Sequence, residues 1–410
     1  MSDDIRVNQD RLWQSHMEMA KIGATPGGGV GRIALTELDK QARDLFVSWC
    51  REAGCDIRID QMGNVFARRA GLDGARPPVM TGSHLDTQPL GGRFDGIFGV
   101  LAGLEAVRAL NDAGVTLRRP FDVVVWTDEE GARFRSGVMG SGVFCEPGKL
   151  EAALAMTDEA GASVGGELTR IGYDGPEPVG GFPVHAYFEA HIEQGPILET
   201  EGKTIGVVQG AQASRRFRVT VEGEEGHAGT LPMTLRRDAL LQAARMIDAI
   251  NKIAFGHDPR PVITVGAIHN RPNSPNTVPG QTVFTIDSRH PHAATLAAID
   301  EEMRTACAEI AEAGGVSLAI EQTSDNAPAA FDPRCVASVG AAAEALGLSK
   351  REIYSGAGHD ACNLSHIAPT GMIFVPCEKG ISHNEKENAR PEDLAAGCDV
   401  LIQVVAEWAA

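Results

Sequence analysis

Three features of the sequence predict an α/β fold with a mostly parallel sheet and an inserted ferredoxin-like domain. Short apolar runs typical of strands alternate with segments of helical period, as in layered α/β proteins. The run at 121–127 (FDVVVWT) is almost continuously apolar, which is typical of strands that helices cover on both faces. Between 214 and 326 the predicted order is strand, helix, strand, strand, helix, strand, which is the ferredoxin-like order. We therefore predict a first domain of residues 1–213 plus 327–410, interrupted by a second domain at 214–326.

The elements of the first domain follow from apolar periodicity. Residues 34–50 are predicted to form a helix, because apolar residues recur at helical spacing and Thr36 with Asp39 resembles a capping box. A closing helix is predicted at 391–408, with Pro391 near its first turn. The remaining predicted elements are a helix at 96–110 and strands at 79–82, 121–127, 184–190 and 372–375.

The inserted domain is predicted from the same signals. Its two helices each carry apolar residues on one face, and its strands are rich in Val, Ile, Phe and Thr. The predicted helices are 233–255 and 293–310, and the predicted strands are 217–221, 262–268, 282–288 and 316–321.

Charge and composition exclude several classes of function. Lys and Arg number 37 and Asp and Glu 55, so the formal net charge is −18. A nucleic-acid binder with a general basic surface is excluded, because phosphate contacts need clustered cations. An anionic membrane surface is an unfavourable partner for the same reason.

The sequence also predicts a cytoplasmic protein without a membrane span. No apolar run reaches the roughly 20 residues that a bilayer requires. The acidic start at 1–4 has no apolar segment behind it, so we expect no secretory signal. The eight cysteines form no C-x-x-C pair and are expected to be reduced thiols. The glycine-rich segment 27–31 is a weak nucleotide signal, because no buried strand precedes it and no Lys-Ser/Thr follows it.

Candidate metal ligands follow four of the predicted strands. Ligands of parallel α/β sheets bind beyond the carboxyl ends of the strands, so side chains that follow these strands can meet at one edge. Taken singly, each is more often structural: a core histidine, a solvated acidic pair or a turn residue. Their shared position at strand ends favours a site made of His84, Asp95, Glu130, His191 and His383.

The chemistry of this set favours two divalent ions. Three imidazoles and two carboxylates suit zinc, and manganese, cobalt or nickel could also serve. Five ligands exceed one open tetrahedral site, and a carboxylate that bridges two ions explains the surplus. Asp95 is the expected bridge, because it lies in a Gly-flanked turn. Asp86 is expected to hold the imidazole of His84 in one tautomer.

Eight sequence blocks resemble the amidase, hydantoinase/carbamoylase family, a branch of the dinuclear zinc metallopeptidase superfamily. This branch includes N-carbamoyl-L-amino acid hydrolases, β-ureidopropionases and allantoate amidohydrolases. The resemblance covers nearly the whole chain in order. The blocks are GSHLDTQPLGGRFDG (82–96), DEEGARF (128–134), HIEQGPILE (191–199), GHAGTLPM (226–233), RPNSPNTVPG (271–280), DSRHP (287–291), SGAGHDA (355–361) and GISHNEKE (380–387).

The resemblance implies roles for the metal ligands and for the general base. His84, Asp95 and His191 would hold one ion, and Asp95, Glu130 and His383 the other. Glu129 would act as the general base and not as a ligand. The first domain would then be the catalytic, dimetal domain.

The resemblance also implies that the inserted domain is a dimerisation and lid domain of a homodimer. His227 would stabilise the oxyanion, and Asn276 and Arg289 would hold a substrate carboxylate. Lid residues can be supplied by the neighbouring subunit in such families. Gln194 would line the metal pocket. Gly358 and His359 are further candidates for substrate binding, with a capping or packing role as the alternative for His359.

We therefore predict a dinuclear metal-dependent hydrolase of linear amide or ureido C–N bonds, not of peptide bonds. The first hypothesis is an N-carbamoyl-L-amino acid hydrolase that forms the amino acid, CO2 and NH3, with N-carbamoyl-β-alanine as a further candidate substrate. The turn at 92–95 resembles that branch more than the allantoate branch. The alternatives are an allantoate or other ureide amidohydrolase, a metalloexopeptidase or aminoacylase, and a non-catalytic ligand-binding relative.

Overall fold

The computed structural model describes residues 5–257 and 261–410. The chain divides into two compact units. The larger unit comprises residues up to Gly210 and from Ala330 onward, and the inserted unit comprises Ala211–Ala329. The predicted second domain, 214–326, lies within the inserted unit.

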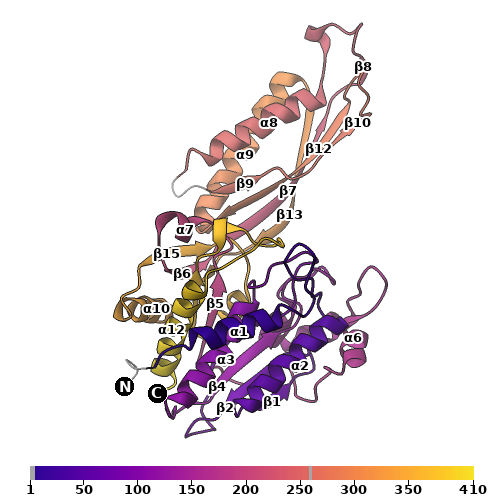
Figure 1. Cartoon of the computed structure of the whole chain (residues 1–410). Coiled ribbons are helices and arrows are strands. Elements are labelled where there is room, and N and C mark those ends of the chain that lie inside the picture. Colours follow the sequence, from indigo (N-terminus) through magenta and orange to yellow (C-terminus); the bar gives the residue numbers. More distant parts are fainter. Residues whose placement is uncertain (1–4, 258–260) are drawn as a thin grey trace. The chain divides into compact units, whose positions relative to one another are not determined.

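A nine-stranded mixed sheet forms the centre of the larger unit (Figure 1). Its four middle strands are parallel to one another, and the strands that pair with them on either side, β2 and β6, are antiparallel. The prediction of a parallel sheet is therefore confirmed for the middle of the sheet, where the strands are completely buried. The order is β1 (Asp56–Ile59), β2 (Val65–Arg69), β4 (Phe121–Trp126), β3 (Val79–His84), β5 (Ala186–Ile192), β16 (Thr370–Val375), β6 (Ile205–Ala211) and β14 (Ala329–Ala330), with β15 (Lys350–Ser355) also on β6.

Helix α3 (Ile97–Asp112) is buried on almost all sides. It contacts β3, β4 and β5 as well as α1 (Gln9–Met19) and α12 (Pro391–Trp408). One acid within it, Glu105, is paired in a bidentate contact with Arg11 of α1, with both N···O distances 2.8 Å. A buried charge needs such a partner, so this pair fixes α1 against the core.

The other helices of the larger unit are shorter or more peripheral. The predicted helix 34–50 is α2 (Glu37–Glu52), and Thr36 caps it by accepting a hydrogen bond from Asp39 N at 3.4 Å. The remaining helices are α4 (Met139–Cys145), α5 (Leu150–Ala155), α6 (Val164–Ile171), α7 (Ile197–Glu201), α10 (Pro333–Ala345) and α11 (Asp360–Leu364), with 3-10 turns at η1 (Pro147–Lys149) and η3 (Glu378–Gly380).

The inserted unit has the predicted ferredoxin-like arrangement. Its main sheet is antiparallel in the order β10-β12-β7-β13, with β9 also paired to β12. Helices α8 and α9 pack on this sheet, and the apolar side chains of β7 alternate inward at Phe217, Val219 and Val221. The elements are β7 (Ala213–Glu222), β8 (Gly226–His227), η2 (Met233–Leu235), α8 (Ala239–Ala254), β9 (Val262–Thr264), β10 (Ile268–Arg271), β11 (Thr277–Val278), β12 (Gln281–His290), α9 (Ala293–Gly314) and β13 (Ser317–Asn326).

Two predicted elements of the inserted unit differ from the structure. The single strand predicted at 262–268 is two short strands, β9 and β10, with Gly266 between them. Glycine weakens a strand because it has no side chain to pack. The helix predicted from 233 begins only at Ala239, because the Asp238 carboxylate accepts a hydrogen bond from Leu241 N at 2.9 Å and caps the helix there.

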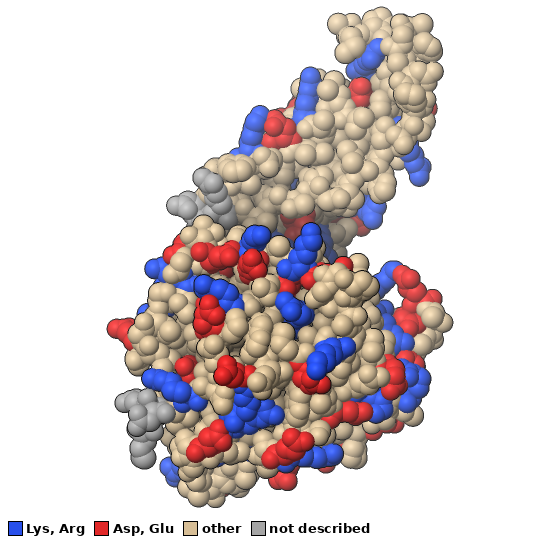
Figure 2. Space-filling view, viewed as in Figure 1, with Lys and Arg blue, Asp and Glu red and all other residues tan. Residues whose placement is uncertain are grey.

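The visible face of the larger unit carries charges of both signs. On the visible face of the larger unit, Lys and Arg side chains are interspersed with Asp and Glu (Figure 2). Among the described residues, no helix is long and apolar enough to cross a membrane.

Candidate metal centre

Four neighbouring strands bring the predicted ligands to one edge of the sheet. In the order β4-β3-β5-β16 these strands run parallel, so their carboxyl ends meet. His84 is the last residue of β3, and His191 lies one residue before the end of β5. Glu130 follows β4, and His383 lies in the segment after β16. This is the edge at which ligands of parallel sheets bind.

Asp95 lies between two groups of ligands, and each of its oxygens faces one group. Its Oδ1 is 3.3 Å from His191 Nε2 and 4.0 Å from His84 Nε2. Its Oδ2 is 3.4 Å from His383 Nε2, and Glu130 Oε2 is 3.3 Å from that same nitrogen. We call His84, Asp95 and His191 the buried half and Asp95, Glu130 and His383 the exposed half. A carboxylate shared in this way is suited to bridging two ions.

A glycine allows Asp95 to come this close to His84. Gly96 has φ +73°, and a Cβ at this position would lie 2.3 Å from the imidazole of His84. Only glycine combines this backbone conformation with that space. The start of α3 therefore depends on Gly96 to place Asp95 in the centre.

Backbone carbonyls orient both imidazoles of the buried half. His84 Nδ1 donates to Asp86 O at 2.8 Å, and His191 Nδ1 donates to Ile192 O at 2.9 Å. In each ring the proton is therefore on Nδ1, and the unprotonated Nε2 faces Asp95. This is the tautomer that binds a metal ion through Nε2.

The carboxylate of Asp86 has a different position from the one expected. Its Oδ1 is 3.9 Å from His84 Nδ1, so the carbonyl of Asp86 and not the carboxylate makes the short contact. The carboxylate instead accepts the backbone N–H groups of Glu129 at 3.4 Å and of Glu130 at 3.2 Å. Asp86 thus connects the loop after β3 to the loop after β4.

The two halves differ in exposure. The side chains of His84, Asp95 and His191 are 2, 5 and 1% exposed, whereas His383 is 52% exposed. Glu129 is 11% exposed, and its Oε2 lies 3.4 Å from His84 Nε2. The centre is therefore closed on the β3 and β5 side and open at His383, with Glu129 beside the buried half.

The electrostatics of the centre favour a cation. Burial raises the pKa of Glu129 well above its usual value, and the nearby carboxylates of Asp360, Glu130 and Asp86 raise it further. Burial lowers the pKa of His84, but the surrounding carboxylates outweigh burial and raise it. Several carboxylates thus lie close together in a buried site. Divalent ions bound there would supply the positive charge that compensates them.

The donor set fits two ions. Ligand atoms of the buried half all lie within 4.8 Å of one another, and so do those of the exposed half. A third group, Glu189, His191 and His359, is equally close. Glu189, however, already accepts hydrogen bonds from Ser83 Oγ and Ala361 N, each at 2.8 Å. Mixed nitrogen and oxygen donors match zinc and the neighbouring divalent metals.

The inserted unit holds two of its predicted site residues together. His227 in β8 pairs with Thr277 of β11, and Asn276 O accepts a hydrogen bond from Ala228 N at 2.9 Å. Gly229 N donates to His227 Nδ1 at 3.0 Å, so the proton of the neutral ring is on Nε2. The exposed imidazole can therefore donate a hydrogen bond through Nε2.

Arg289, on β12 of the same unit, is oriented by an acid on its own strand. Its Nε and Nη2 donate to the two carboxylate oxygens of Asp287 at 2.8 and 3.2 Å. This pairing raises the pKa of Arg289. Asp287 also accepts from Arg216 Nε at 2.9 Å, so two guanidinium groups share one carboxylate.

Comparison with known proteins identifies the family. The model of Peptidase family M20/M25/M40 matches residues 80–407, which include all five candidate ligands and Glu129. The chain belongs to this peptidase family.

Several similar proteins are named as amidases or as hydrolases of ureido compounds. A curated N-carbamoyl-L-amino-acid amidohydrolase of Rhizobium meliloti is 48% identical over 404 residues, 98% of this chain and 97% of that protein. A ureidoglycolate hydrolase of Oryza sativa is 34% identical over 99% of this chain and 86% of that protein. A solved hydantoinase/carbamoylase family amidase of Burkholderia multivorans has a TM-score of 0.96 and 54% identity, with 99% of this chain and 98% of that chain covered. This protein is therefore a hydantoinase/carbamoylase family amidase, a metal-dependent hydrolase of amide or ureido C–N bonds.

The remaining predicted residues of this M20-family chain occupy distinct environments. Gln194 has φ +57° and donates to Asp95 Oδ2 at 2.9 Å. His359 is 2% exposed, its Nε2 lies 2.8 Å from Ser355 Oγ, and its ring centroid is 4.5 Å from that of His191. The buried imidazole thus supports His191, whereas Gly358 before it is exposed.

Three supporting residues were not singled out from the sequence. Glu387 accepts the backbone N–H groups of Phe94 at 2.9 Å and Asp95 at 3.1 Å. Ser382 Oγ donates to Asp95 Oδ2 at 2.8 Å, and Gln88 Nε2 donates to Glu130 Oε2 at 2.8 Å. Ser382 and Glu387 lie in the block that holds His383, but a sequence gives no signal for such contacts between distant loops.

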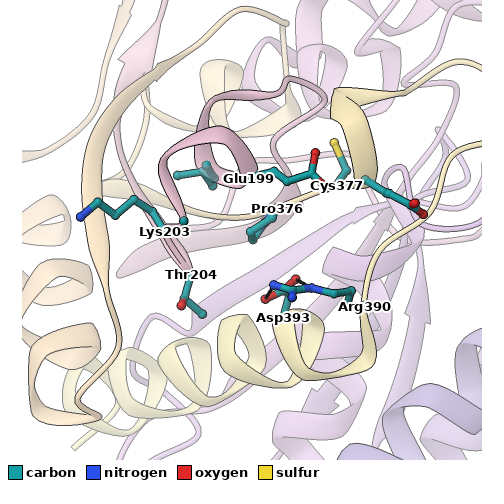
Figure 3. A pocket seen from close by; sticks show the side chains of 10 residues that line it. Glu199, Lys203, Thr204, Pro376, Cys377, Arg390 and Asp393 are labelled. Carbon is teal, nitrogen blue, oxygen red and sulfur yellow. Dashed lines mark hydrogen bonds and ion pairs between the residues drawn. The ribbon is translucent and has the colours of Figure 1, made fainter.

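A separate cavity of about 460 Å³ lies in the larger unit, and none of the candidate ligands lines it (Figure 3). Arg390 and Asp393 form an ion pair on its wall, at 2.7 Å. Cys377, also on the wall, donates through Sγ to Gly195 O at 3.7 Å, one residue after Gln194. The cavity is therefore next to the loop that supports the centre, and it is distinct from the centre itself.

Proposed function

We propose that this enzyme hydrolyses the carbamoyl C–N bond of N-carbamoyl-L-amino acids and releases the amino acid, CO2 and NH3. The observation that carries the proposal is the bridging position of Asp95 between two His and carboxylate groups, with Glu129 beside them. The similarity to an N-carbamoyl-L-amino-acid amidohydrolase over 98% of the chain supports the substrate class.

In the proposed centre, His84, Asp95 and His191 would hold one divalent ion, and Asp95, Glu130 and His383 would hold the other. Bound ions lower the pKa of water toward about 7 and polarise a carbonyl oxygen. Glu129 accepts a proton from the attacking water and delivers it to the leaving nitrogen. The position of Glu129 supports this role, because its Oε2 lies beside the buried half, 3.4 Å from His84 Nε2. We propose zinc as the native metal, with manganese, cobalt or nickel as alternatives.

The inserted unit is proposed to supply the contacts to the substrate and the interface of a homodimer. His227 Nε2–H would donate to the oxyanion of the tetrahedral intermediate, a type of contact worth roughly 3–4 kcal/mol. Arg289, already oriented by Asp287, would bind the substrate carboxylate together with Asn276. Gln194 and Gly358 of the larger unit are proposed to contact the substrate at the metal centre. We place the enzyme in the cytoplasm.

Ammonia release across a substrate panel tests this proposal. The panel contains N-carbamoyl-L-α-amino acids, N-carbamoyl-β-alanine, allantoate, ureidoglycolate, an N-acetyl amino acid and a dipeptide. We expect turnover of the carbamoyl-L-α-amino acids to be fastest. Turnover of ureidoglycolate or allantoate alone would favour the second candidate, a ureide amidohydrolase, which the ureidoglycolate hydrolase at 34% identity supports. Turnover of the dipeptide or N-acetyl substrate alone would contradict both.

A further inference from the structure

We infer that Gln88 positions Glu130 as a ligand of the exposed half and thereby sets the affinity of the centre for its second ion. The inference rests on the ligand assignment in the proposed function. Gln88 lies in the loop after β3, outside the ligand set, and acts through Glu130.

Gln88 contacts both oxygens of the Glu130 carboxylate. Its side-chain Nε2 donates to Oε2 at 2.8 Å, and its backbone N donates to Oε1 at 3.2 Å. The same Nε2 is 3.4 Å from the carbonyl oxygen of Glu130. Each carboxylate oxygen thus accepts one hydrogen bond from Gln88, and Oε2 also lies 3.3 Å from His383 Nε2. The carboxylate is held in a single orientation toward the exposed half.

The backbone of Gln88 is itself fixed, so its side chain is the part that a substitution can change. Its carbonyl accepts hydrogen bonds from Thr87 Oγ1 at 2.8 Å and from Gly91 N at 3.2 Å. Thr87 Oγ1 in turn accepts from Arg32 N at 2.8 Å. The contact from Gln88 N to Oε1 would therefore persist in a side-chain variant, and only the two Nε2 contacts, to Oε2 at 2.8 Å and to the Glu130 carbonyl at 3.4 Å, would be lost.

The exposed half depends on this contact more than the buried half does. Backbone carbonyls orient His84 and His191 in the buried half. His383, in contrast, is 52% exposed, and its Nε2 faces the carboxylates of Asp95 and Glu130. Glu130 is then the fixed ligand that belongs to the exposed half alone. Loss of its amide partner should weaken the second ion and leave the first almost unchanged.

The experiment is a calorimetric titration of chelator-stripped full-length protein with Co2+, combined with the visible absorption of the bound cobalt. The variants are Gln88→Leu, which removes the amide, and Gln88→Asn, which keeps the amide but is one methylene too short. Partners of metal ligands typically contribute 10- to 100-fold to metal affinity. We expect both variants to weaken the second binding step by about 10- to 100-fold and the first step by less than about threefold.

Gln61→Leu is the matched control, because Gln61 is an exposed glutamine whose backbone N donates to Glu177 O at 2.9 Å. It should titrate like the wild type, and urea unfolding should show that all variants fold. If Gln88→Leu bound both Co2+ ions with wild-type affinity, or if both binding steps were weakened equally, the role of Gln88 would be overturned. The ligand assignment would still stand. Absence of any cobalt binding by the wild type would overturn the ligand assignment and this inference together.

Discussion

At the residue scale, Glu129 is the side chain whose proposed role is easiest to separate from metal binding. It lies beside the buried half but outside both ligand groups. We predict that Glu129→Gln keeps its metal and lowers kcat by about 10²- to 10⁴-fold, the usual contribution of a general acid or base. Ammonia release and metal content of the same preparation measure this. Glu159→Gln, at an exposed acid, is the control, and near-normal turnover in Glu129→Gln would contradict the proposed mechanism.

His16 gives a second prediction at this scale, away from the ligands. Its imidazole is completely buried against Phe94 and Phe98, and burial lowers its pKa from 6.5 to about 4. The folded protein holds His16 neutral while the unfolded chain takes up a proton near pH 6.5. Its contribution to stability is therefore complete above pH 6.5 and is lost as the pH falls toward 4, by at most about 3 kcal/mol.

Urea unfolding of metal-free protein between pH 7 and 4 tests the role of His16. We predict a flatter pH dependence for His16→Leu than for the wild type. His366→Leu, which replaces an exposed histidine, should follow the wild-type curve. Parallel curves for wild type and His16→Leu would show that His16 does not contribute.

At the element scale, the turn before α3 joins the fold to the centre. Gly96→Ala introduces a Cβ 2.3 Å from the His84 ring at φ +73°. Gly54→Ala is a matched control, because Gly54 has φ +82° but open space around its Cβ position. We predict that Gly54→Ala costs about 1 kcal/mol of unfolding free energy from backbone strain alone.

Gly96→Ala should cost more than this control and should also weaken metal binding, because His84 or Asp95 must move. Urea unfolding and metal titration of the two variants measure the two effects. Equal losses of stability with unchanged metal affinity would mean that the approach of Asp95 to His84 tolerates a side chain.

The same scale shows what the sequence could predict. Buried parallel strands are apolar runs, and the ends of such strands meet, so His84, Glu130, His191 and His383 could be placed together from the sequence. The supporting contacts of Gln88, Ser382 and Glu387 join loops that are far apart in the chain, and no periodicity encodes them. The sequence also did not predict that the strand is divided at Gly266. The short strands on either side of it, β9 and β10, each pair with β12, and this pairing joins segments that are not adjacent in the chain.

At the scale of the whole molecule, the formal net charge of −18 opposes the binding of an anionic substrate. The proposed clamp at Arg289 must then supply the local attraction. We predict that Arg289→Ala raises KM for N-carbamoyl amino acids by about 10- to 100-fold, as expected for loss of a charge-assisted hydrogen bond.

Steady-state kinetics with a matched control test the clamp. Arg216→Ala removes the other guanidinium on Asp287, from the neighbouring strand, and should change KM far less. A substrate whose carboxylate is replaced by an amide should bind wild type and Arg289→Ala alike. Similar KM increases in the two arginine variants would contradict a specific clamp.

The metal content of Asp95→Ala shows whether one carboxylate joins the two proposed metal sites. Elemental analysis of metal-reconstituted protein, with Glu129→Gln as a control that keeps every ligand, measures ions per chain. We predict two ions per chain in wild type and Glu129→Gln, and loss of both in Asp95→Ala, because each half loses the ligand it shares. Two ions retained in Asp95→Ala, or a single ion in the wild type, would contradict this prediction.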